Sequence, residues 1–310
     1  MKLFRFAGLT AALVTLSLLF ACTPVSTVPP ENSLTFTDDL GRTVTLPAAP
    51  KKTAAVTGSF AEVWQLAGGT LAAATQDAWN EDKLPADSNA VNLGAMKSPS
   101  VEQMLEEGID FVILSANIEE HVQLQSQLET LSIPCAYFEV ELFQDYLRML
   151  KTCTGITGRA DLYEKNGLAV QARIDNAIAR AEGQPTPTVL FIRAFSTGAR
   201  AKGSDNMTGA MLKELGCINI ADREVSLLDD LSLETIIEED PEYILFVTMG
   251  ESEEKALASM KTLLEDNPAF EGLTAVKNGR YTLLPKDLFH LKPNNRWGES
   301  YEMLADILYE

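Results

Sequence analysis

Five basic side chains lie in the second half of a strongly acidic chain, in loops beside segments that are expected to form strands. They are Arg193, Arg200, Lys202, Lys292 and Arg296. The sequence holds 25 Lys and Arg against 44 Asp and Glu, a formal net charge of −19. Guanidinium groups bind carboxylates and phosphates through paired hydrogen bonds, and ammonium groups attract them by charge. The set favours an anionic ligand, although each member alone is as well explained by solvation or a local ion pair.

Four further candidates occupy comparable positions. Phe60 and Lys97 follow expected strands of the first half, and His290 and Trp297 follow the last expected strand. The imidazole could ligate a metal centre or haem iron, and the aromatic rings could stack on a planar ligand. Such side chains more often pack in the core or lie on the surface, so we assign no metal ligand and no cofactor.

A repeated segment indicates how these loops are positioned. SVEQMLEEGIDFVIL (100–114) and SLETIIEEDPEYILF (232–246) align without a gap. Each starts with a serine suited to cap a helix and ends in an apolar run typical of a buried strand. Apolar residues at helical spacing predict one buried stripe per helix. The stripe residues are Val101, Met104 and Leu105 in the first copy, and Leu233, Ile236 and Ile237 in the second. Two α/β lobes are therefore expected.

A long helix is expected between the lobes. The segment GRADLYEKNGLAVQARIDNAIARAEG (158–183) holds no helix breaker except Gly167 and is followed by Pro185 and Pro187. A helix of this length spans roughly 35 Å. Ligands of open α/β sheets bind beyond the carboxyl ends of the strands, so the candidate loops should face a cleft between the lobes.

The N-terminus has the features of a secretory signal. Lys2 and Arg5 precede an apolar run (7–20) that is too short for an ordinary membrane span. The sequence LFAC places Ala21 directly before Cys22, as in the lipobox of bacterial lipoproteins, which it resembles. We expect Cys22 to carry the lipid; the alternative is a plain signal peptide with an unrelated cysteine. Without Lys2 and Arg5 the net charge is −21, which argues against nucleic acid or anionic lipid as a binding partner.

Taken together, these features resemble the substrate-binding lipoproteins of ABC importers for iron-siderophores, haem and cobalamin. The features are the lipobox, the hairpin-like FTDDLGRTVTLP (36–47), the repeated block and the interlobe helix. Apart from the lipobox, the resemblance covers the chain from about residue 34 to the C-terminus. The resemblance implies two doubly wound, Rossmann-like α/β lobes joined by one long helix, with a ligand cleft between them that closes modestly. It also implies that Glu102 and Glu234 dock onto basic residues of the permease. The helix dipole by itself also favours a carboxylate at both positions.

We expect five segments. They are a lipoprotein signal peptide (1–21), a flexible tether (22–33), an N-terminal lobe (34–155), the interlobe helix (156–184) and a C-terminal lobe (185–310).

The expected function is that of a monomeric receptor anchored by lipid on the extracytoplasmic face of the membrane. It would pass an anionic metal complex, an iron-siderophore first and haem or cobalamin next, to an ABC permease dimer. A receptor for free zinc or manganese is disfavoured, because His121 and His290 are the only histidines. A lipid-anchored enzyme is disfavoured because the sequence lacks G-x-S-x-G, H-E-x-x-H and G-x-x-x-x-G-K-[ST]. A sensor with the same fold stays open.

Overall fold

A computed structural model describes residues 33–250 and 252–310, and each of its two lobes is built on a five-stranded sheet. The first sheet has the order β5-β4-β3-β6-β7, and all its strands are parallel. Its strands are β3 Thr53–Ala55, β4 Leu71–Ala74, β5 Val91–Asn92, β6 Phe111–Ser115 and β7 Cys135–Phe138. The chain starts in the middle, builds one edge and then returns to build the other. This doubly wound order places its switch point between β3 and β6.

The other elements of the first lobe cover this sheet. The helices are α1 Gly58–Leu66, α2 Asp77–Asn80, α3 Val101–Glu106, α4 Glu119–Gln123 and α5 Gln125–Thr130. A hairpin of β1 Leu34–Thr37 and β2 Thr43–Leu46 precedes them, as expected. Its turn is held by an ion pair from Arg42 to Asp38 at 2.7 Å. The Asp39 amide donates to the carbonyl oxygen of Tyr137 at 2.9 Å, which attaches the hairpin to β7.

The second lobe repeats the design with one strand reversed. Its sheet has the order β10-β8-β11-β12, and β9 pairs antiparallel with the end of β8. The strands are β8 Thr188–Phe195, β9 Gly198–Ala201, β10 Ile218–Asn219, β11 Tyr243–Thr248 and β12 Tyr281–Leu283. The helices are α9 Met207–Glu214, α10 Ser226–Asp229, α11 Leu233–Glu239, α12 Glu253–Met260, α13 Thr274–Lys277 and α14 Lys286–Phe289. The switch point lies between β8 and β11.

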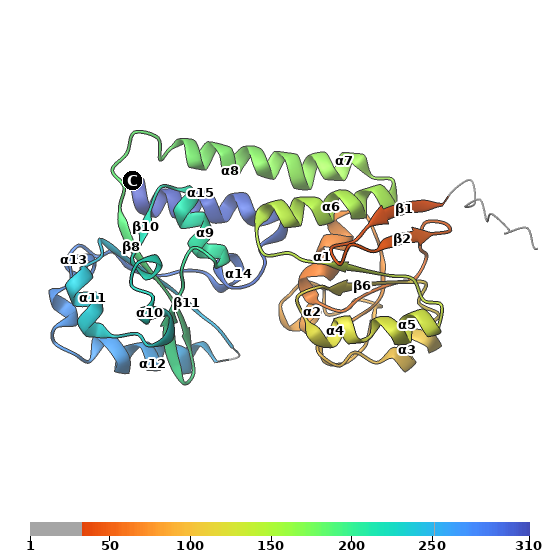
Figure 1. The fold of residues 1–310 in the computed structure, drawn as a ribbon, viewed down its shortest axis with the longest axis horizontal. Helices are drawn as coiled ribbons and strands as arrows, with labels where there is room; N and C mark the ends of the chain where they lie inside the picture. The colour runs from red at the N-terminus through yellow and green to blue at the C-terminus, as the bar shows by residue number, and fades with distance from the viewer. Residues whose placement is uncertain (1–32, 251) are drawn as a thin grey trace, which may run out of the picture.

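Long helices run along one side of both lobes (Figure 1). They are α6 Phe143–Thr157, α7 Ala160–Tyr163, α8 Ala169–Ala179 and the C-terminal α15 Trp297–Tyr309. A π-helical turn, Glu164–Leu168, joins α7 to α8, so the expected interlobe helix is continuous from Ala160 to Ala179. Gly158 ends α6 in the left-handed conformation at φ 70°. A Cβ atom on Gly167 would lie 2.7 Å from the Leu147 side chain, so glycine there lets the π-helical turn lie against α6.

The lobes share one apolar core. Ile113 of β6 and Val247 of β11 belong to the same buried cluster, which runs through α6, α8 and α15. At the junction, Phe143 and Trp297 meet edge to face with ring centroids 6.1 Å apart. The interlobe helix is therefore packed on both lobes, and this packing favours only a small change in their angle.

The repeated helices differ from expectation at one position each. Ser100 and Ser232 cap α3 and α11, and Met104 and Ile236 are buried as predicted. The prediction was wrong for the next residue in each copy, because Leu105 is 55% exposed and Ile237 is 41% exposed. Successive side chains of a helix point about 100° apart around its axis, so the residue after Met104 or Ile236 no longer faces the sheet.

Candidate ligand-binding cleft

Two adjoining cavities lie where the carboxyl ends of both sheets meet. Their volumes are about 330 Å³ and 740 Å³, and residues of both lobes line each of them. Asp77, Glu81, His290 and Leu291 line both cavities. We call the pair the interlobe cleft.

The first lobe contributes residues that follow its strands at the switch point. Thr57 comes two residues after β3, and Ser115 ends β6. Thr57 also caps α1, accepting from the Phe60 amide at 3.3 Å. The Gly58 amide donates to the Asp77 carboxylate at 2.6 Å, so a carboxylate of the protein itself already occupies the start of α1. This helix terminus is therefore not free to bind a ligand anion.

The second lobe contributes a basic wall. Lys286, His290 and Lys292 follow β12 and line the cleft. Arg193 lies near the end of β8, opposite Val247 of β11, at the switch point of the second sheet. Among the residues of the described ranges, no carboxylate forms an ion pair with any of these four.

Burial shifts the pKa values of this wall. It lowers the pKa of Arg193, and it lowers the pKa of Lys292, with Glu141 and Asp145 opposing the shift and Arg193 adding to it. Burial, reinforced by Arg193, Lys286 and Lys292, lowers the pKa of His290 to about 4, so its imidazole is neutral at pH 7. Arg193 Nε and His290 Nδ1 are buried, and neither has a hydrogen-bond partner in the part of the chain that the structure describes.

The first lobe faces this wall with carboxylates. Asp77 Oδ1 is buried and has no hydrogen-bond partner within residues 33–250 and 252–310. Burial, together with the charge of Asp77, raises the pKa of Glu81. Glu141 accepts a hydrogen bond from Asn117 Nδ2 at 3.1 Å. Within residues 33–250 and 252–310, no group of three or more His, Cys, Asp or Glu side chains is arranged to hold a metal ion. The cleft thus offers charge and hydrogen bonds rather than a closed coordination shell.

Four of the nine expected ligand residues lie in or beside the cleft. Phe60, His290 and Lys292 line it, and Arg193 is close enough to influence the pKa values of both His290 and Lys292. Phe60 is only 4% exposed and packs edge-on against Phe138, with ring centroids 6.4 Å apart. Phe60 therefore packs within the cleft wall and also lies where it could contact a ligand.

The structure places the other five away from the cleft lining. Lys97 is exposed and pairs with Glu120 at 3.1 Å, and Arg296 pairs with Glu299 at 2.8 Å. Trp297 is 1% exposed in the shared core. Arg200 is exposed on β9, and the half-buried Lys202, directly after β9, lines neither cavity.

The charged cleft residues that sequence reasoning missed are Asp77, Glu81, Asp82, Lys286 and Asp287. Asp77 comes three residues after β4, whose sequence LAAA is rich in alanine and lacks the β-branched residues typical of strands. An interpretation of this segment as a strand would have put Asp77 and Glu81 on the list.

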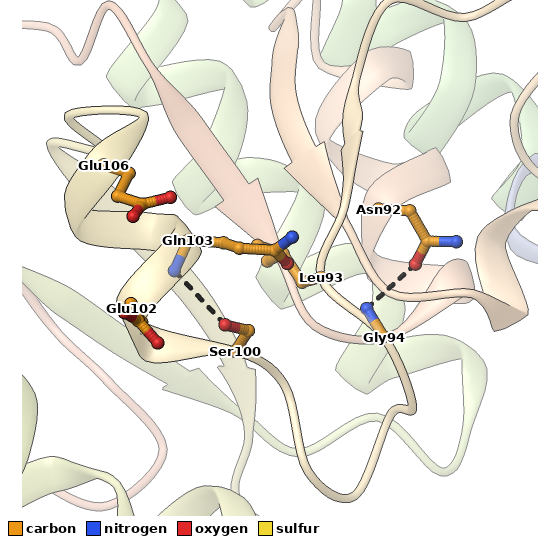
Figure 2. Close-up of a pocket in the computed structure, with 7 residues that line it drawn as sticks. All are labelled: Asn92, Leu93, Gly94, Ser100, Glu102, Gln103 and Glu106. Atoms are coloured by element: carbon orange, nitrogen blue, oxygen red, sulfur yellow. Dashed lines mark hydrogen bonds between the residues drawn. The ribbon is translucent and has the colours of Figure 1, made fainter.

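The two expected docking glutamates lie outside the cleft. Glu102 and Glu234 are in the first turns of α3 and α11, directly after the capping serines, and both are exposed. Figure 2 shows Glu102 one turn before Glu106, at the edge of a surface hollow of about 720 Å³ beside the Ser100 cap. The hydroxyl of Ser100 accepts from the Gln103 amide at 3.2 Å.

Two doubly wound lobes, a connecting helix and a charged cleft at both switch points define a two-lobed solute-binding protein. The family model described as Periplasmic binding protein matches residues 54–288, and the chain belongs to this family. No curated protein matches the sequence. The family resemblance and the fold class inferred from the sequence are confirmed.

Solved structures share this fold at low identity. The siderophore binding protein BauB, bound to acinetobactin and ferric iron, has a TM-score of 0.69 at 16% identity, covering 90% of this chain and 100% of its own. The catecholate-siderophore binding protein VctP from Vibrio cholerae has a TM-score of 0.68 at 14% identity, covering 90% and 100%. S. aureus IsdE complexed with heme has a TM-score of 0.67 at 14% identity, covering 84% and 99%. These likenesses establish the fold.

Proposed function

We propose that this chain is the extracytoplasmic receptor of an ABC importer and that it binds an anionic metal complex, an iron-siderophore first, in the interlobe cleft. The observation that carries the proposal is the basic wall, in which Arg193, Lys286 and Lys292 surround the neutral His290 and form no ion pair with a carboxylate of the described residues. The similar structures bound to a ferric siderophore complex and to heme support this ligand class.

The physical argument is one of charge compensation. A half-buried guanidinium that has no ion pair and a buried nitrogen without an acceptor costs free energy, which a bound anion would offset. Arg193 has an unpartnered Nε, and the neutral His290 has an unpartnered Nδ1 beside it. A ligand that carries oxygen anions would satisfy the guanidinium, and the imidazole would donate to it or accept from it according to its tautomer.

Haem is the second candidate ligand, because His290 is neutral and its Nδ1 has no hydrogen-bond partner among the described residues. Neutral imidazole is the form that ligates iron. Cobalamin is a third candidate from the family resemblance alone.

The anchor and the docking partner belong to the same proposal. Cys22 would carry the lipid, although it lies outside the described residues, as do the signal peptide and all of the tether except Ser33. No helix in the part of the chain that the structure describes has both the length and the apolar composition of a membrane span. Glu102 and Glu234 would dock the monomeric receptor on a permease dimer.

Titration of the purified mature protein against a ligand panel tests this function. The panel holds ferric catecholate, hydroxamate and carboxylate siderophores, haem and cobalamin, and binding is followed by tryptophan fluorescence and native mass spectrometry. We expect saturable binding of one ferric siderophore without product formation. Turnover of a bound compound would support an enzyme, and a shifted haem absorption band that His290→Ala abolishes would support the haem receptor. Absence of binding across the panel would contradict the ligand class.

A further inference from the structure

His121 is one of the two histidines of the chain, and the structure buries it fully inside the first lobe. It lies on α4 and is 0% exposed. Its Nδ1 accepts from the Ser115 amide at 3.2 Å, and its Nε2 contacts the Met96 carbonyl oxygen at 2.8 Å. An amide N–H only donates and a carbonyl oxygen only accepts. The two contacts together therefore require the neutral ring with its hydrogen on Nε2.

Both partners of the ring belong to the wall of the interlobe cleft. Met96 lies in the loop after β5, Ser115 ends β6, and both line the cavity of about 330 Å³. β3 pairs with β6 from Phe111 to Ile113, so the Ser115 amide lies beyond the end of that pairing. The imidazole takes the place that a strand carbonyl would fill there. It thereby joins two separate segments of the cleft wall.

Further hydrogen bonds extend from Ser115 along the same wall. Ser115 Oγ accepts from the Asn117 amide at 3.2 Å, and Asn117 Nδ2 donates to Glu141 at 3.1 Å. Asn117 and Glu141 also line the cavity. The position of Ser115 is thus passed on to two polar side chains that a ligand in the cleft would meet.

The surroundings of His121 keep the ring in place and neutral. The hydroxyl of the buried Tyr137 donates to the His121 carbonyl oxygen at 3.0 Å, which holds α4 against β7. Burial lowers the pKa of His121, with the Met96 bond and the charges of Asp77 and Glu120 opposing the shift. A protonated ring would turn a hydrogen on Nδ1 toward the Ser115 amide, which is itself a donor.

We propose that His121 is a positioning residue for ligand binding, because its ring holds Met96 and Ser115 at fixed places in the first-lobe wall of the interlobe cleft. This role rests on the proposed function. His121 lines neither cavity, so its effect on binding passes through the residues that it holds. A wall that is already ordered binds more tightly, since less conformational freedom is lost when the ligand arrives.

Three substitutions separate the two ring bonds. His121→Asn places an amide oxygen near the position of Nδ1 and keeps an acceptor for Ser115. His121→Gln places an amide nitrogen near the position of Nε2 and keeps a donor for Met96. His121→Leu removes both bonds.

Amide hydrogen exchange, measured by NMR on the full mature protein, reports the two bonds without any ligand. The Ser115 amide reports its own bond to the ring. The Ser100 amide donates to the Leu93 carbonyl oxygen at 2.8 Å and closes the loop that carries Met96. Exchange should rise about threefold or more at Ser115 in the Gln variant, at Ser100 in the Asn variant, and at both in the Leu variant.

Tyr137→Phe is the matched control for a general loss of stability. It removes a buried hydrogen bond to the His121 carbonyl oxygen and leaves both ring bonds, so exchange at Ser115 and Ser100 should stay at the wild-type value. An equal rise at both amides in all three His121 variants would show a general structural role and overturn the proposal. Unchanged exchange in His121→Leu would overturn it as well.

A binding assay separates this inference from the proposed function. Ferric citrate, ferrioxamine B and ferric enterobactin are titrated against the wild type and each variant by tryptophan fluorescence. A probe that binds the wild type should lose about tenfold in affinity or more in His121→Leu, less in the Asn and Gln variants, and nothing in Tyr137→Phe. Equal affinity of the wild type and His121→Leu would overturn the positioning role and leave the receptor function standing. Failure of all three probes to bind the wild type counts against the proposed function, whereas the exchange pattern decides whether His121 holds the wall.

Discussion

The side-chain amide of Asn294 donates to the carbonyl oxygen of Ser59 at 3.0 Å and so joins the two lobes. The same amide reaches Glu62 Oε2 at 2.5 Å, and Glu62 pairs with Lys83 at 2.9 Å. Asn294 is 1% exposed and has a φ of 51°, a conformation that asparagine tolerates better than most residues. The segment that carries His290 and Lys292 is thereby held against α1 and the cleft.

Asn294→Ala should lower the free energy of unfolding by about 2 kcal/mol, because it leaves the Ser59 carbonyl and the Glu62 carboxylate short of a buried donor. Chemical denaturation measures this change. Asn295→Ala is the control, since no hydrogen bond involves the Asn295 side chain within the described residues. Equal stability of the two variants would contradict the role of Asn294.

Arg193→Gln should weaken binding of the anionic ligand about tenfold or more, because a charged hydrogen-bond donor is lost. The same change should raise the free energy of unfolding of the ligand-free protein by about 1 kcal/mol, because it removes a half-buried charge that has no ion pair within the described residues. Calorimetric titration and denaturation measure the two effects. Arg223→Gln is the control for ligand binding and should leave it unchanged, because Arg223 is exposed and pairs with Glu239 of α11 outside the cleft lining. Destabilisation by Arg193→Gln would indicate a structural role instead.

The stability of the ligand-free protein should fall between pH 6.5 and pH 4 through His290. Its pKa in the folded state is about 4, against an ordinary value of 6.5, because burial and three neighbouring cations disfavour the charged imidazolium. In this window the unfolded chain binds the proton and the folded chain does not, so the free energy of unfolding decreases as the pH falls. The loss is on the order of 3 kcal/mol and is complete below the folded-state pKa.

The difference between the wild type and His290→Gln isolates this contribution. Burial also lowers the pKa of His121 and raises that of Glu81, but both contributions cancel in the difference. The denaturation midpoints of the wild type and of His290→Gln, measured at pH 7, 6, 5 and 4, should approach each other or cross as the pH falls. A pH-independent difference would refute the depressed pKa.

Two helical glycines should respond to alanine with opposite signs. A Cβ atom on Gly209 of α9 would lie 2.0 Å from the backbone oxygen of Gly203, so Gly209→Ala should destabilise the protein by about 2 kcal/mol or more. Gly155 of α6 has open space, so Gly155→Ala should stabilise by about 0.5–1 kcal/mol. Thermal unfolding distinguishes the two, and a stable Gly209→Ala protein would show that the loop at Gly203 yields.

Much of the fold follows from local sequence. The serine caps at Ser100 and Ser232, the hairpin and the helix from Ala160 to Ala179 are all predictable, because caps, alternation and helical periodicity depend on residues a few positions apart. Recognition of the repeat then indicated two lobes.

Tertiary structure decided which side chains face the cleft. His290 and Lys292 line it, yet Arg296 and Trp297, only a few residues further on, turn to a surface ion pair and to the shared core. That turn depends on Asn294 binding α1 of the other lobe, a contact between residues far apart in the sequence. Likewise, the sheet beneath α3 buries Met104 and leaves Leu105 exposed. Residue types and spacing determined which elements form, whereas the direction of each side chain was set by long-range packing that local spacing does not encode.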